Sequence, residues 1–67
     1  MTAEDPPEVG ETVNVRNGDR WRLAVVVDTN AADGYRPAGF TAHPHIGDVL
    51  SDSLWWFAVQ SSDWQRR

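Results

Sequence analysis

The chain has 67 residues, 10 acidic and 6 basic side chains, a formal net charge of −4 and no cysteine. A chain of this length forms one domain, near the lower limit at which a single hydrophobic core stabilises a fold. The absence of cysteine excludes disulfides and thiolate metal sites and agrees with a reducing compartment. The negative charge disfavours general nucleic-acid binding, because the protein and the phosphate backbone would repel each other.

The start of the chain predicts a tail. Residues 1–8 are acidic, contain two prolines and show no apolar periodicity, so we expect them to be disordered and the domain to cover residues 9–67. The tail lacks the basic-then-apolar pattern of a secretory signal, and no apolar run approaches the length of a membrane span. We therefore expect a cytoplasmic protein with no membrane or nucleic-acid partner.

The first predicted strand covers residues 10–16. Val13 and Val15 alternate there with polar side chains, which is the period of two of a strand with one buried face. Asn17-Gly18 follows and predicts a type I′ hairpin turn, because both central residues of that turn need positive φ. Asp19 can widen this turn into a longer loop.

The second predicted strand covers residues 20–28. One of its faces is wholly apolar, and we expect it to point inward; it comprises Trp21, Leu23, Val25 and Val27. The same parity places Arg16, Arg20 and Arg22 on the outer side of the hairpin as a basic strip. Such a strip is either a solvated face paired with carboxylates or a binding surface.

The middle of the chain contains two loops and a weaker strand. Residues 29–34 form a loop, and residues 35–43 form a strand that Pro37 and Gly39 confine to an edge or a bulge. Phe40 is its core candidate. Residues 44–53 are a second long connection, with a short helical turn at residues 47–51. Three apolar side chains of this connection are expected to plug the end of the barrel: Ile46, Val49 and Leu50.

The fourth predicted strand, residues 53–60, is the most aromatic part of the chain. Trp55, Phe57 and Val59 share one face and Leu54, Trp56 and Ala58 the other, so both faces are apolar. One face fills the core; bulk alone favours the Trp55 face, but the two faces remain alternatives. The other face needs a loop, a subunit or a ligand to cover it. Residues 61–64 predict a single helical turn capped by serine, after which Trp64 returns to the core and residues 65–67 form a short strand or fray.

These elements predict an all-β fold of four to five short antiparallel strands with a single C-terminal helical turn. A valine strand, a short loop, a tryptophan-opened valine strand, a meander and an aromatic strand follow one another. This order resembles the SH3-like small barrel of Tudor and KOW modules over about residues 9–66. The resemblance implies a small barrel that binds its partners through loops and sheet edges.

A second resemblance is to the plasmid-borne type II dihydrofolate reductases. It rests on Gly10, Glu11, Val13, Arg16, Gly18 and Trp21 in matching spacing, and on Val25-Val26, Thr29-Asn30, Gly34-Tyr35 and Ala42-His43-Pro44 with short length changes. In that family the subunits surround a shared pore lined by a Val-Gln-Ile-Tyr segment. The corresponding segment here is Leu54-Trp55-Trp56-Phe57, and no lysine matches the pore lysine. The resemblance implies a barrel that self-associates, and it points Trp55 and Phe57 at neighbouring subunits.

No constellation in the sequence predicts catalysis, a cofactor or a metal. His43 and His45 are two residues apart and could approach Asp48 or Asp52 at a metal, but Pro44 between them favours an ordinary turn. The loop carboxylates have no general acid/base context, and the serines have no nucleophile-elbow context. The chain contains no phosphate-binding glycine loop.

The aromatic side chains are the feature that points to a function. Together with the apolar residues they exceed what so small an interior can bury, and exposed tryptophan beside arginine is typical of protein interfaces. We expect a non-catalytic module that binds a protein partner or itself, such as a complex subunit or a phage- or plasmid-type inhibitor. The expected contact residues are Trp55, Trp56, Phe57, Tyr35, Arg20 and Arg22. The alternatives are a cage for methylated lysine or arginine built on Tyr35 and Phe40, and an oligomeric oxidoreductase like the type II reductases.

Overall fold

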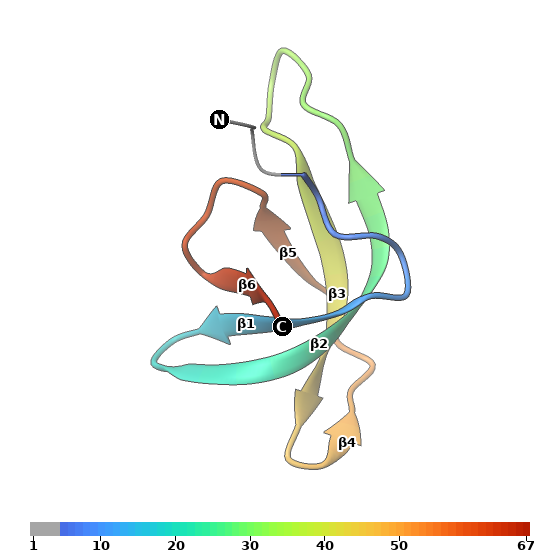
Figure 1. The fold of residues 1–67 in the computed structure, drawn as a ribbon, viewed down its shortest axis with the longest axis vertical. Coiled ribbons are helices and arrows are strands. Elements are labelled where there is room, and N and C mark those ends of the chain that lie inside the picture. Colours follow the sequence, from blue (N-terminus) through green and yellow to red (C-terminus); the bar gives the residue numbers. More distant parts are fainter. Residues whose placement is uncertain (1–4) are drawn as a thin grey trace.

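The computed structural model describes residues 5–67, so the disorder predicted for residues 1–4 lies outside the described residues. Six strands make one antiparallel sheet in the order β4-β3-β2-β1-β6, with β5 paired to β3 (Figure 1). The all-β prediction is confirmed. No residue from 5 to 67 is helical, so residues 47–51 and 61–64 do not form the expected helical turns. The strands are β1 Thr12–Asn17, β2 Arg20–Asn30, β3 Gly39–Ile46, β4 Val49–Leu50, β5 Trp55–Ala58 and β6 Trp64–Arg66.

The long strand β2 organises the sheet. Its first half pairs with β1, from Asn17↔Arg20 to Thr12↔Val25, and its second half pairs with β3, from Ala24↔Pro44 to Asn30↔Gly39. A register shift between Val26 and Asp28 marks a β-bulge, which bends a strand and increases its twist. The strand therefore curves and folds the sheet over on itself. β6 then pairs with β1 and β5 with β3, but no pairing joins β5 to β6, so the sheet is not closed.

The β1–β2 turn reverses the predicted inner face of β2. Asn17 pairs with Arg20, so the turn residues are Gly18 and Asp19. Gly18 has φ 86°, whereas Asp19, like every other described residue that is not glycine, does not have positive φ, which fits a type II′ turn rather than the expected type I′. A two-residue turn places Val13 opposite Ala24 and Val15 opposite Arg22. Residues directly opposite share a face, so the even-numbered residues of β2 point inward.

The expected inner face of β2 is therefore its outer face. Ala24 and Val26 are buried, whereas Trp21, Leu23 and Val27 are exposed. The predicted basic strip is wrong for the same reason. Arg16 lies on the outer face opposite Trp21, but Arg20 and Arg22 continue the inward row beyond the end of the core.

Nine apolar side chains among residues 5–67 form the core. Phe40 lies at its centre, as expected. The centre of the Phe40 ring is 5.5 Å from the centre of the Phe57 ring and 5.1 Å from that of the Trp64 ring. Trp64 returns to the core as predicted, and its indole N–H donates to the Val59 carbonyl oxygen at 2.9 Å. The buried set is Val13, Val15, Ala24, Val26, Phe40, Ala42, Phe57, Val59 and Trp64.

The segment after β3 does not plug the barrel. Ile46 pairs with Val49 around a turn whose first residue, Gly47, has φ 65°, so β3 and β4 form a hairpin that projects from the sheet (Figure 1). Ile46, Val49 and Leu50 are all exposed on this hairpin, which corrects the expectation that they are buried. The hairpin directs β3 away from β2 beyond Pro44, and this leaves the first residues of β2 without a partner on that side.

The residues before β1 are attached to the domain. Pro7 is fully buried, and the backbone of Gly10 and of Glu11 bonds to Val26. Arg66 holds this segment from the other end of the chain. Its guanidinium donates to the carbonyl oxygens of Asp5 and Pro6 at 3.0 and 3.1 Å and pairs with the Glu11 carboxylate at 3.3 Å.

Candidate functional site

Strand β5 has one core face and one outer face. Phe57 is 8% exposed and packs in the core, and Trp55 packs against the core from its edge. Leu54 is 60% exposed and Trp56 43% exposed on the opposite side. Of the two alternatives left open by the sequence, the structure shows the one that bulk favours. The orientation implied by the reductase resemblance is wrong. We expected Phe57 to contact a partner, but its side chain is buried in the core.

Trp56 lies flat across β3 and reaches β2. Its indole N–H donates to the side-chain oxygen of Asn30 at 2.8 Å. A Cβ atom on Gly39 would overlap the indole of Trp56 and lie 2.6 Å from the Phe57 carbonyl oxygen. Gly39 therefore leaves the space that the indole occupies, and the aromatic ring covers the glycine in return. The remaining indole surface stays in solvent.

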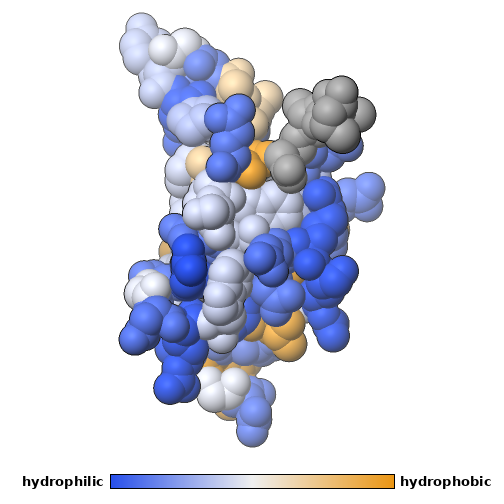
Figure 2. Space-filling model, turned by 60° about the vertical axis from the view of Figure 1, so that its left-hand side comes forward, coloured by the Kyte–Doolittle hydropathy of each residue, from blue (hydrophilic) through white to orange (hydrophobic). Residues whose placement is uncertain are grey.

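A groove runs beside β5 on the side that pairs with no strand. It has a volume of about 580 Å³ and lies between β5, the β1–β2 turn and residues 61–63. Figure 2 shows this side as a pale column flanked by blue hydrophilic side chains. We call it the tryptophan groove; its principal lining residues are Leu54, Trp55, Trp56, Arg16 and Asp63.

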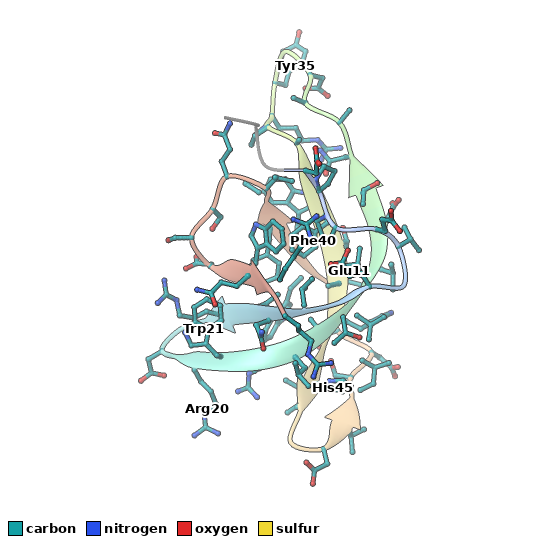
Figure 3. The ribbon with its side chains drawn as sticks, in the orientation of Figure 1. Glu11, Arg20, Trp21, Tyr35, Phe40 and His45 are labelled. Carbon is teal, nitrogen blue, oxygen red and sulfur yellow. The ribbon has the colours of Figure 1, made fainter. Side chains whose placement is uncertain are left out.

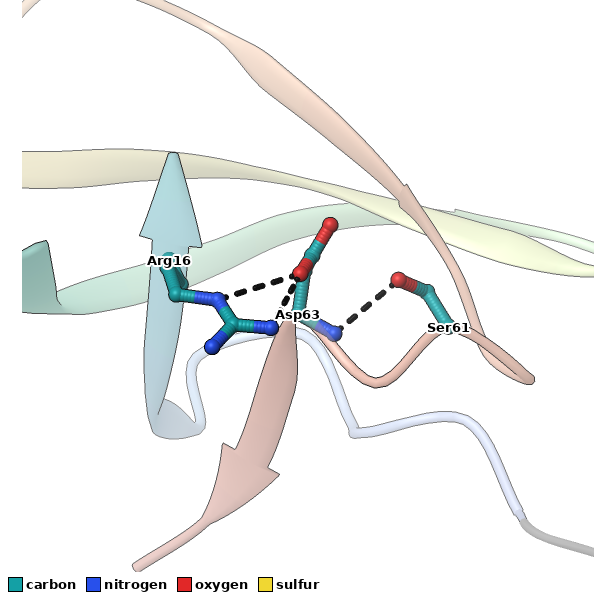
Figure 4. Close-up of polar contacts among 3 residues, drawn as sticks. All are labelled: Arg16, Ser61 and Asp63. Carbon is teal, nitrogen blue, oxygen red and sulfur yellow. Dashed lines mark hydrogen bonds and ion pairs between the residues drawn. The ribbon is translucent and has the colours of Figure 1, made fainter. Parts of the chain in front are cut away.

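An ion pair forms the polar wall of the tryptophan groove (Figure 4). The Arg16 guanidinium donates through Nε and Nη2 to Oδ1 of Asp63, at 3.2 and 2.9 Å. Its backbone N–H also donates to the Asp63 carbonyl oxygen, and the Ser61 hydroxyl accepts from the Asp63 N–H. The guanidinium lies 5.1 Å from the centre of the Trp21 ring, within cation–π range. These contacts hold the 61–63 turn against β1 and give the groove a fixed rim.

A second groove, of about 420 Å³, lies where β3 separates from β2. We call it the arginine groove; it is lined by Arg20, Trp21, Arg22, Leu23, His45 and Asp48 together with Gly47. Figure 3 shows Arg20 and Trp21 at the hairpin end of β2, and His45 at the base of the projecting hairpin. Among residues 5–67, neither Arg20 nor Arg22 forms an ion pair.

Tyr35 lies at the tip of the loop between β2 and β3, at the far end of the molecule (Figure 3). Its side chain is 99% exposed. The Asp33 carboxylate accepts from the backbone N–H groups of Tyr35 and Arg36 at 2.7 and 3.0 Å. These bonds, that to Tyr35 first, hold the pKa of the Asp33 carboxyl below its ordinary value of 3.8. The loop tip is thus a defined turn that presents one aromatic ring.

The six expected contact residues do not form one surface. Trp55 and Trp56 line the tryptophan groove, Arg20 and Arg22 line the arginine groove, and Tyr35 lies apart from both. The cage expected around Tyr35 and Phe40 is not formed, since Phe40 is fully buried. Sequence reasoning missed Leu54, Arg16 and Asp63 as members of the tryptophan groove. The position of Leu54 on the outer face of the aromatic strand could have predicted its exposure. Asp63 reaches Arg16 only because β6 pairs with β1, and no local sequence pattern predicts that pairing.

His43, one of the two histidines considered as metal ligands, has a structural role instead. His43 bonds through Nδ1 to the Ser53 carbonyl oxygen at 2.8 Å, which holds the β4–β5 connection against β3. Within residues 5–67, no group of three or more His, Cys, Asp or Glu side chains is placed to bind a metal ion. The same part of the chain has no helix long and apolar enough to cross a membrane.

Comparison of the chain with protein families, with curated proteins and with solved structures finds no match. The functional conclusion therefore rests on the two grooves and the residues that line them.

Proposed function

We propose that this chain is an SH3-like small barrel that acts by binding a protein, itself or another, and that the tryptophan groove is the contact surface. The barrel is supported by the curvature of β2 and by the return of β6 to β1, which wraps the sheet around Phe40. A small accessory chain, such as a complex subunit or a phage- or plasmid-type inhibitor, would act in this way.

The observation that carries the proposal is the exposure of Leu54 and Trp56 beside an unpaired strand edge. The core is complete without either side chain, and Leu54 in particular leaves its apolar surface in water without contributing to the core. An unpaired edge exposes N–H and C=O groups that a second chain can bond. A large aromatic side chain beside such an edge, with a fixed Arg16–Asp63 rim, has the composition of an interface centre.

Light scattering and site-specific cross-linking test this proposal. A photoreactive benzophenone side chain at position 54 is expected to capture a partner or a second copy of the chain in the cells that make the protein. Position 9 is the matched control, because Val9 is apolar, is 63% exposed and lies on the segment before β1. The proposal fails if the chain is a monomer and position 54 captures no more than position 9.

Substitutions at the same two positions separate binding from stability. Leu54→Ser is expected to weaken the captured complex at least ten-fold while leaving the melting temperature within about 2 °C, because an exposed side chain contributes little to the fold. Val9→Ser is expected to change neither. Loss of the complex with Val9→Ser as well would indicate nonspecific adhesion.

The reductase-like alternative has no support from the geometry. It requires the residues at positions 55 and 57 to line a pore between subunits, but Phe57 is in the core and Trp55 packs on it. We expect the purified chain to show no NADPH-dependent reduction of dihydrofolate. A measurable rate that saturates with both substrates would favour the alternative.

A further inference from the structure

We propose that the arginine groove binds an extended segment of a partner protein in which acidic and apolar residues alternate. This site is separate from the tryptophan groove and does not depend on it. The segment adds as a strand to the free edge of β2 at residues 20–23, with its acidic side chains on Arg20 and Arg22 and its apolar side chains on Trp21 and Leu23.

The backbone of β2 offers an unpaired edge at this point. In an antiparallel sheet, the backbone groups of alternate residues point to opposite edges. Val26 bonds with Gly10 and Glu11 on the β1 side, so Trp21 directs its N–H and C=O groups to the other edge, where no residue of β3 pairs with it. The ladder between β2 and β3 ends at Ala24↔Pro44, and the groove begins there. An added strand would continue the sheet in the place that β3 leaves.

The side chains of this edge alternate between cationic and apolar. Arg20 and Arg22 share one face, and Trp21 and Leu23, both partly exposed, share the other. Residues two apart on a strand are about 7 Å apart, so acidic residues two apart on the added strand lie directly opposite the two arginines. Guanidinium groups bind carboxylates with paired, planar hydrogen bonds.

The two arginines also have no ion-pair partner in the described part of the chain. Neither forms an ion pair with another residue between 5 and 67, and Nε of Arg22 is buried without a hydrogen bond. A buried donor left without a partner destabilises the fold, and because protein atoms cover Nε, a bound carboxylate would meet the guanidinium through its other nitrogens. His45 lies on the same groove and adds a donor. Asp48 is the one acidic side chain of the lining, and it stands on the projecting hairpin opposite β2.

Two synthetic peptides of equal composition and charge test the alternation. The first repeats Glu-Val four times, so all its glutamates share one face of a strand. The second repeats Glu-Glu-Val-Val twice, so neither face carries two successive glutamates. Fluorescence anisotropy of labelled peptides with the full chain is expected to show at least ten-fold tighter binding of the first, and the affinity is expected to fall with added salt. Amide shifts in NMR spectra are expected to centre on Trp21 and Leu23.

Charge-matched variants separate the site from general attraction. Arg22→Gln and Arg20→Gln are each expected to weaken binding of the first peptide at least ten-fold. The exposed Arg20 provides a test that does not depend on folding if the half-buried Arg22 is needed for stability. Arg36→Gln removes the same charge from the exposed loop and is expected to leave the affinity within two-fold. Asp48→Asn is expected to strengthen binding. Equal affinity for both peptides, no binding at millimolar concentration, or equal losses with Arg20→Gln and Arg36→Gln would each overturn the proposal.

Discussion

The contact between Gly39 and Trp56 leads to a specific prediction, that Gly39→Ala severely destabilises the protein. The added Cβ would meet the Trp56 indole and lie 2.6 Å from the Phe57 carbonyl oxygen. The carbonyl belongs to the β3–β5 pairing and cannot move without disturbing it, since Phe40 and Phe57 are paired there. The indole would therefore have to leave its place on β3 and release Asn30.

The size of the effect follows from two contributions. Overpacking a filled site costs about 1–3 kcal/mol. The lost bond between the Trp56 indole and Asn30 costs about 0.5–1.5 kcal/mol more. The free energy of unfolding should therefore fall by about 1.5–4.5 kcal/mol. A core of this size supplies about 3–5 kcal/mol in total, so the variant is expected to be partly or wholly unfolded at 25 °C.

Urea denaturation followed by circular dichroism measures this loss. Gly34→Ala is the matched control, because a Cβ there meets nothing within 4 Å. Its effect should stay within about 1 kcal/mol and can be stabilising. The double variant Gly39→Ala with Trp56→Ala should recover part of the loss if the indole is the main obstacle. A change below about 0.5 kcal/mol for Gly39→Ala would refute the close contact itself.

Three further predictions concern the core, the rim and the loop. Phe40→Ala is expected to lose about 3–5 kcal/mol and unfold the chain, whereas Tyr35→Ala should leave the melting temperature unchanged; a thermal scan compares them. Arg16→Ala should cost about 0.2–1 kcal/mol for the half-exposed pair with Asp63, and urea denaturation in high salt should show a smaller loss. Because the pKa of Asp33 is lowered in the folded protein, its carboxylate stabilises the loop turn above pH 3.8. This stabilisation is lost as the pH falls through the lower pKa of the folded state, so the Tyr35 amide shift should report one transition below pH 3.8.

The sequence predicts the elements of this fold better than their faces. Val13 and Val15 point inward as their alternation indicates, and Phe40 and Trp64 are in the core. On β2, both faces carry apolar residues, so hydrophobicity alone cannot choose between them. The number of turn residues decides: two residues at Gly18 and Asp19 pair Val13 with Ala24, whereas a three-residue loop would have turned Trp21 inward.

The candidate surfaces were predictable only in part. The aromatic strand indicates that some rings stay exposed, and Trp56 and Trp21 do. The separation of the arginines from Trp56 follows from the pairing of distant strands, which no local pattern contains. The arginine groove beside residues 20–23 depends on where β3 leaves β2, and that point, at Pro44, cannot be read from the sequence of β2 itself.

The hydrogen bonds from Arg66 to the carbonyl oxygens of Asp5 and Pro6 place the first and last described segments of the domain side by side. A short flexible linker could therefore join these ends, and new termini could be opened in the exposed loop near Tyr35 without cutting a strand. Such a circularly permuted chain would keep both grooves intact. It would also place an affinity handle at the end of the molecule remote from either groove, where surface immobilisation leaves both accessible.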